Sequence, residues 1–126
     1  MDTVEMDKIV TGWIAGSDAE LGSAEYERHV EALDEVMDWM VEGEGERLWE
    51  FVLAAYKRDL SDKVIAMLAA GPLEDLLAKC GVDYIDRVEE LARKDPRFNY
   101  LLGGVWRNSM TDDVWQRVQA IRNNVW

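Results

Sequence analysis

Hydrophobic residues recur every three to four positions along most of the chain, the spacing that places them on one face of an α-helix. No segment shows the sustained alternation of apolar and polar residues that is typical of a strand. The pattern predicts an all-α protein, a compact bundle of about seven to eight short helices in which consecutive helices are antiparallel neighbours. Residues 46–102 also fit two helix pairs stacked like a short solenoid, although no fixed-period repeat supports that arrangement.

Capping residues and helix breakers set the expected boundaries. The residues expected to cap helices at their N-termini are Ser23, Ser61, Asp83 and Thr111. The pair Asp95-Pro96 predicts another boundary, because the residue before proline disfavours the helical conformation. The expected helices cover about 4–15, 24–41, 46–58, 62–70, 72–80, 84–94, 96–102 and 112–121.

The run from Gly71 to Asp75 has a mechanical interpretation. Gly71 can adopt the left-handed conformation that ends one helix, and Pro72 suits the first position of the next, where its missing N–H costs nothing. Glu74 and Asp75 then lie in the first turn, where the helix dipole favours anions. We therefore expect a structural role for Gly71, Pro72, Glu74 and Asp75.

Composition narrows the class of protein. The apolar fraction of 48% excludes a disordered acidic tail, although 26 acidic residues against 14 basic ones give a net charge of −12. That charge argues against direct binding of nucleic acid or of anionic membranes. The start of the chain lacks the pattern of a signal peptide, and no apolar stretch is long enough to span a membrane. We expect one cytoplasmic domain over residues 1–126.

The net charge is concentrated in one part of the chain. Residues 17–50 hold twelve acidic side chains against two basic ones, a net charge of −10, whereas residues 51–126 hold eleven of each. The domain is therefore expected to consist of acidic N-terminal helices (residues 1–45) and a neutral helical body (residues 46–126).

The expected helix of residues 23–42 concentrates this charge further. An apolar stripe (Tyr26, Val30, Leu33, Met37 and Met40) is expected to face the core. Beside it lies a continuous acidic face without compensating i,i+4 lysines: Glu27, Glu31, Asp34, Glu35, Asp38 and Glu42. Trp39 falls at the edge of that face, where it is either an anchor for a binding partner or covered by another helix.

Candidate chemistry is sparse. The one histidine, His29, lies one helical turn after Glu25, which favours an ion pair, and a lone histidine cannot form a His-rich metal site. The one cysteine, Cys80, excludes an internal disulfide and is expected to be a small buried group. The carboxylates of residues 42–46 lack the ligand spacing of an EF-hand loop, so a solvated turn is expected there. We expect no catalytic residue, no cofactor, no metal and no enzymatic activity.

A family resemblance rests on the run Gly71-Pro72-Leu73-Glu74-Asp75-Leu76-Leu77 and on the continuing spacing through Asp95-Pro96-Arg97-Phe98. With these residues the chain resembles the bacterial domain of unknown function 6869 over roughly residues 48–118. The resemblance implies a small helical domain with no established activity and no known catalytic residues. Within the motif, Glu74 has two alternative roles: pairing with an arginine such as Arg87 or Arg97, or direct contact with a partner or substrate.

Three functional hypotheses remain, two from the charge and one from the apolar residues near the C-terminus. The first is an inhibitor module, most simply an immunity-type protein, whose acidic face neutralises a basic partner protein. The second is a phage-encoded inhibitor of a host defence nuclease that acts by partial nucleic-acid mimicry. The third is a structural domain that forms homo-oligomers through Trp106, Trp115, Val125 and Trp126.

Overall fold

Helices and short connections make up the whole chain, and the computed structural model describes all 126 residues. The helices are α1 (Thr3–Asp18), α2 (Ala24–Arg28), α3 (Val30–Glu42), α4 (Gly45–Tyr56), α5 (Asp62–Leu68), the π-helical turn η1 (Ala69–Leu73), α6 (Glu74–Lys94), α7 (Pro96–Leu102) and α8 (Asp112–Ile121). No strand is present, so the predicted all-α class is confirmed.

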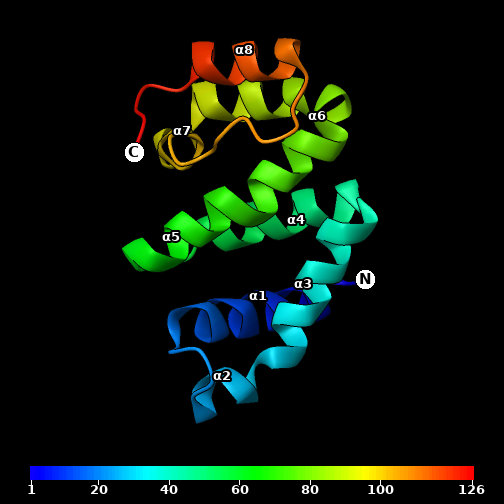
Figure 1. Cartoon of the computed structure of the whole chain (residues 1–126), viewed down its shortest axis with the longest axis vertical. Helices are drawn as coiled ribbons and strands as arrows, with labels where there is room; N and C mark the ends of the chain where they lie inside the picture. Colours follow the sequence, from blue (N-terminus) through cyan, green and yellow to red (C-terminus); the bar gives the residue numbers. More distant parts are fainter.

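The helices form three successive levels along the long axis of the molecule (Figure 1). At one end α1 packs against α2 and α3, α4 and α5 cross the middle, and α6 leads to the other end, where it carries α7 and α8. One connected hydrophobic core runs through all three levels, from Met6 in α1 to Val118 in α8. The acidic N-terminal helices and the neutral body therefore share their apolar interior.

Several of the predicted boundaries are confirmed by their caps. The Ser23, Ser61 and Thr111 side chains accept hydrogen bonds from backbone N–H groups in the first turns of α2, α5 and α8. Asp95 caps α7 in the same way and precedes Pro96, as expected. Gly43 takes a left-handed conformation (φ 67°) that ends α3. Each of these positions depends only on neighbouring residues, which explains why the pattern predicts it.

The expected boundary at Gly71 and Pro72 is wrong. Gly71 has no positive φ, and the chain remains helical without a gap from Asp62 to Lys94 through η1. A proline inside an α-helix lacks a donor and clashes with the carbonyl one turn back, whereas the wider π-helical turn leaves room for its ring. Because α5 and α6 are continuous, residues 46–102 do not divide into two separate helix pairs.

The second expected boundary in this run, between Cys80 and Asp83, is a kink instead of an end. Cys80 departs from helical geometry (φ −126°, ψ 17°), but the helix continues, and Asp83 is an exposed helical residue that caps nothing. Gly81 is buried where α8 crosses, and a Cβ atom at this position would lie 3.0 Å from the Val114 side chain. The glycine therefore permits a close helix crossing.

The expected long helix of residues 23–41 is also divided. His29 (φ −114°, ψ 9°) separates α2 from α3 and belongs to neither. As a result Tyr26 and Glu27 lie on a different helix from the other residues of the predicted stripe and the predicted acidic face. Two short helices replace one continuous ridge.

Candidate functional site

Most of the predicted acidic face lies together on α3 in the structure. It consists of Glu31, Asp34, Glu35, Asp38 and Glu42, which fall within about 100° of arc on the helix. Four of them are exposed and Glu35 is half-buried. None of the five takes part in an ion pair, because all ion pairs of the protein join other residues. Glu27 is exposed as well, but it lies on α2.

Trp39 is not part of this surface, which corrects its assignment as a partner-binding residue. Its side chain is only 2% exposed and contacts Phe51 of α4 edge-on, with 6.3 Å between the ring centroids. Val36, one turn earlier, is fully buried. Trp39 and Val36 therefore form the core face of α3, and no partner can reach them in the folded protein.

The apolar stripe that was expected to face the core lies at its edge: Leu33 and Met40 are half-buried and pack against the core, and Met37 is exposed. Leu33, Met37 and Met40 lie about 60° to 130° around α3 from the core face, and Met37 is 54% exposed. They form one wall of an open groove with a volume of about 380 Å³. The groove is lined from α1 and the following turn by Trp13, Gly16, Ser17, Ala19 and Leu21, from α2 by Tyr26, and from α5 and η1 by Lys63, Met67, Gly71 and Pro72.

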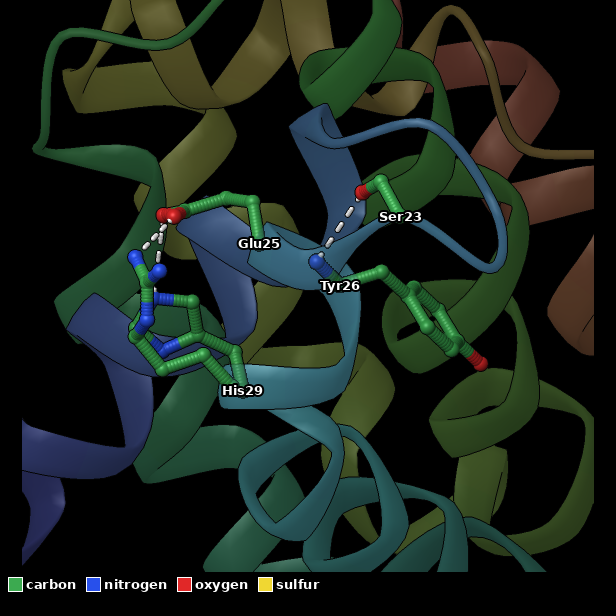
Figure 2. A network of polar contacts seen from close by, with 5 residues as sticks. Ser23, Glu25, Tyr26 and His29 are labelled. Atoms are coloured by element: carbon green, nitrogen blue, oxygen red, sulfur yellow. Dashed lines mark hydrogen bonds and ion pairs between the residues drawn. The ribbon is translucent and has the colours of Figure 1, made fainter.

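A local polar network lies within α2 and its caps, beside this groove (Figure 2). His29 Nε2 lies 3.2 Å from Glu25 Oε1, which confirms the predicted pair, and Arg28 contacts the other carboxylate oxygen of Glu25. Ser23 Oγ accepts a hydrogen bond from the Tyr26 N–H at 3.1 Å. The Tyr26 ring points away from Glu25 and His29, and it lines the groove.

The residues of the Gly71–Asp75 motif contact several other parts of the chain. Gly71 and Pro72 line the groove. Glu74 accepts hydrogen bonds from the Trp106 N–H (2.8 Å) and from the Asn108 side chain (3.3 Å), so it fixes the turn between α7 and α8 and pairs with neither Arg87 nor Arg97. Asp75 pairs with Lys79 at 3.0 Å, and Lys79 also donates to the Met40 carbonyl at the end of α3. Glu74 and Asp75 do not cap a helix, and their contacts join other parts of the fold.

Several carboxylates of the helical body have partners, whereas others, such as Glu50 and Asp83, are exposed without one. Glu46 accepts hydrogen bonds from Tyr84 Oη (2.8 Å) and Arg87 (3.1 Å), and these bonds hold its pKa below the usual value. Burial and the bond to Glu46 raise the pKa of Tyr84 to about 12. Residue 46 was expected in a solvated turn, so sequence reasoning missed this pair. Predicting this pair would have required knowing that α6 lies against the start of α4, which no local pattern indicates.

Three further carboxylates, Glu89, Asp86 and Asp95, have partners as well. Arg117 of α8 donates to Glu89 at 2.6 Å and to Asp86, and the hydrogen bond holds the pKa of Glu89 below its usual value. Asp95 accepts a hydrogen bond from Tyr56 Oη at 2.7 Å, which lowers the pKa of Asp95. These contacts link helices that lie far apart in the sequence.

No catalytic arrangement stands out. Burial raises the pKa of the half-buried Cys80 thiol, which lies 3.7 Å from the Gly43 carbonyl oxygen. A raised pKa disfavours the reactive thiolate. The structure contains no group of three or more His, Cys, Asp or Glu side chains placed to hold a metal ion. None of the helices combines the length and apolarity needed to cross a membrane.

The fold and the site together define a small all-α domain with an unpaired acidic face beside an apolar groove. The chain belongs to a family of unknown function, DUF6869, which it matches over residues 21–125. The predicted resemblance is thus confirmed and extends beyond residues 48–118 to include α2 and α3. No curated protein and no solved structure matches the chain.

Proposed function

We propose that this protein is an inhibitory binding module that neutralises a basic partner protein through the acidic face of α3, as an immunity-type protein in the cytoplasm would. The observation that carries the proposal is that all five carboxylates of the face lack an ionic partner, although the chain holds 14 Lys and Arg residues. Like charges on one helix face forgo the stabilisation that i,i+4 pairs provide. A basic protein surface would supply the missing partners and would be attracted from a distance.

A nucleic-acid mimic that inhibits a defence nuclease is the alternative form of this proposal. The acidic face carries five negative charges and no positive one on a helix of 13 residues, which is about 20 Å long. Duplex DNA carries about 12 charges over that length. The face has less than half the charge density of DNA, which favours recognition of a basic protein surface over imitation of a duplex.

Charge reversal tests the proposal. The variant Glu31→Lys/Glu35→Lys/Asp38→Lys should abolish capture of a basic protein from lysate of the source cells, because attraction becomes repulsion at the same surface. The matched control, Asp59→Lys/Asp83→Lys/Asp113→Lys, changes the net charge equally at exposed carboxylates without ionic partners elsewhere, and it should retain capture. Circular dichroism should show the same helical content for both variants.

The captured protein, identified by mass spectrometry and purified, then decides between the two forms. An immunity-type inhibitor should block its activity, and a mimic should in addition compete with DNA or RNA for its binding site. Equal capture by the wild type and the α3 variant would contradict the acidic-face proposal in both forms.

Self-association is a second candidate, because Trp106 is 61% exposed and Val125 is 62% exposed. The other predicted members of this surface are engaged within the chain: Trp126 stacks on Tyr100 at 5.3 Å, and Arg122 lies over the Trp115 ring. If Trp106 mediates self-association, the sedimentation coefficient should rise with concentration for the wild type and stay constant for Trp106→Ser.

A further inference from the structure

The apolar groove and the acidic face are two sides of the same helix. Leu33 and Met37 face the groove, and the next residue after each, Asp34 and Asp38, lies about 100° further around α3. A molecule that fills the groove therefore has the acidic face immediately beside it. Met37 is 54% exposed at this edge of the groove.

The groove wall consists largely of flexible apolar side chains. Met37 and Met40 of α3 face Met67 of α5, which is 43% exposed, and Leu21 at the open end is 85% exposed. Three of the six methionines of the chain thus gather in one groove. Methionine adapts its shape to a bound apolar surface and is over-represented at surfaces that bind peptides.

A buried hydroxyl within the groove lacks a partner. Ser17 is 4% exposed and lines the groove, and its Oγ makes no hydrogen bond. A buried polar atom without a partner costs free energy, which a bound molecule with a polar atom in reach would recover. The groove lining thus includes one buried polar side chain among its mostly apolar residues.

The charges around the groove specify the sign of the occupant. Lys63 is the only basic side chain among its lining residues, and its Nζ already donates to the carbonyls of Asp18 and Ala19 at the end of α1. The carboxylates of the acidic face have no such partners. An apolar occupant that carries positive charge on its outer side is complementary to both surfaces.

We propose that the groove takes the apolar face of a basic amphipathic helix presented by the partner protein. This inference rests on the proposed function, and it assigns the partner's recognition element: apolar residues at i, i+3 or i+4 and i+7 enter the groove, and Lys and Arg beside them contact the acidic face. The apolar contacts provide specificity that charge attraction alone lacks.

Methionine-methyl NMR of the full chain tests this inference with a defined probe. The probe is a peptide of Leu, Phe, Lys and Ala with its apolar residues on one helical face, and its control is a scrambled peptide of the same composition. The amphipathic peptide should shift the methyl signals of Met37, Met40 and Met67 and leave those of the buried Met6 and Met110 in place. Equal affinity of the scrambled peptide would overturn the proposal.

Titration calorimetry with three variants separates the groove from the acidic face. Met37→Gln/Met67→Gln should weaken the amphipathic peptide about tenfold, as loss of anchor contacts does, because both side chains are exposed enough to be replaced without loss of the fold. The control Val4→Gln/Val82→Gln changes two exposed valines outside the groove and should bind as the wild type does.

The charge-reversal variant of the acidic face completes the comparison and should also weaken the peptide. Loss of binding on charge reversal together with full binding by the methionine variant would overturn the groove proposal and leave the proposed function standing. Full binding of the peptide by the charge-reversal variant would overturn both the groove proposal and the proposed function, because the occupant would then not be selected by its charge.

Discussion

The α3 helix and the α6–α8 region differ in whether their carboxylates have partners. In α6 and α8, Glu89 and Asp86 share Arg117, and Tyr84 and Arg87 of α6 hold Glu46 of α4. On α3 five carboxylates have no ionic partner. Burial does not explain the difference, because Asp86 and Glu46 have partners although their side chains are 84% and 60% exposed. The paired carboxylates of the body contribute to the fold, whereas those of α3 remain available to another molecule.

The largest expected effect concerns the position of Trp39 in the core. Trp39→Ala should lower the free energy of unfolding by about 3–5 kcal/mol, because it leaves a cavity against Phe51. Trp106→Ala, at an exposed tryptophan, should change it by about 0.5 kcal/mol or less. Urea denaturation followed by circular dichroism measures both values. A small loss for Trp39→Ala would return this residue to the list of candidate binding residues.

A smaller effect is expected from the paired carboxylates of the body. Glu89→Gln should lower the free energy of unfolding at pH 7 by about 1 kcal/mol, since Arg117 loses one of its two ionic partners and keeps only Asp86. The folded-state pKa of Glu89 is depressed, so its contribution is present above the unfolded pKa and is lost as pH falls through the folded value. The difference between Glu89→Gln and the wild type should therefore shrink from pH 7 to pH 3.

Urea denaturation at a series of pH values measures this difference. The control is Glu50→Gln on α4, an exposed carboxylate without an ionic partner, which should cost nothing at pH 7. A difference between Glu89→Gln and the wild type that stays constant down to pH 3 would show that the Arg117 pair contributes nothing through its charge.

The smallest effect, and the one of opposite sign, is expected on α3. Glu31→Gln/Glu35→Gln/Asp38→Asn should raise the free energy of unfolding by a few tenths of a kcal/mol per removed like-charge pair, because repulsion along the face is relieved. The gain should decrease at high salt, since exposed charges are screened. Thermal denaturation at low and high ionic strength measures it. A loss of stability on neutralisation would indicate that the acidic face has a structural role after all.

The parts of the fold that the sequence predicts are those that depend on near neighbours. The caps at Ser23, Ser61, Asp95 and Thr111 and the pair of Glu25 with His29 involve residues within four positions of one another. Periodicity likewise predicts that α3 has an apolar stripe and an acidic face. These features need no knowledge of what packs against them.

The features that pattern alone could not predict depend on distant contacts. The α3 helix has two apolar faces. The face with more apolar residues was expected in the core, but it lines the groove with Leu33, Met37 and Met40. The core is instead formed by Val36 and Trp39, because α1 and α4 cover that side. Glu74 and Glu46 find partners 32 and 38 positions away in sequence, at Trp106 and Tyr84, which no local pattern indicates.

The π-helical turn of residues 69–73 restricts where the chain can change length. A π turn holds about one residue more than an α turn, so deleting one residue there would restore ordinary α geometry and keep the helices on either side nearly in register, whereas deleting one residue from α5 would rotate everything that follows by about 100°. The buried Leu76 and Leu77 would then leave the core. By contrast, insertions at residues 19–23 or 106–109 would only lengthen turns. Family members of different length are therefore expected to differ in those two turns or by one residue at the π turn, while the α-helical part of α5 keeps its length.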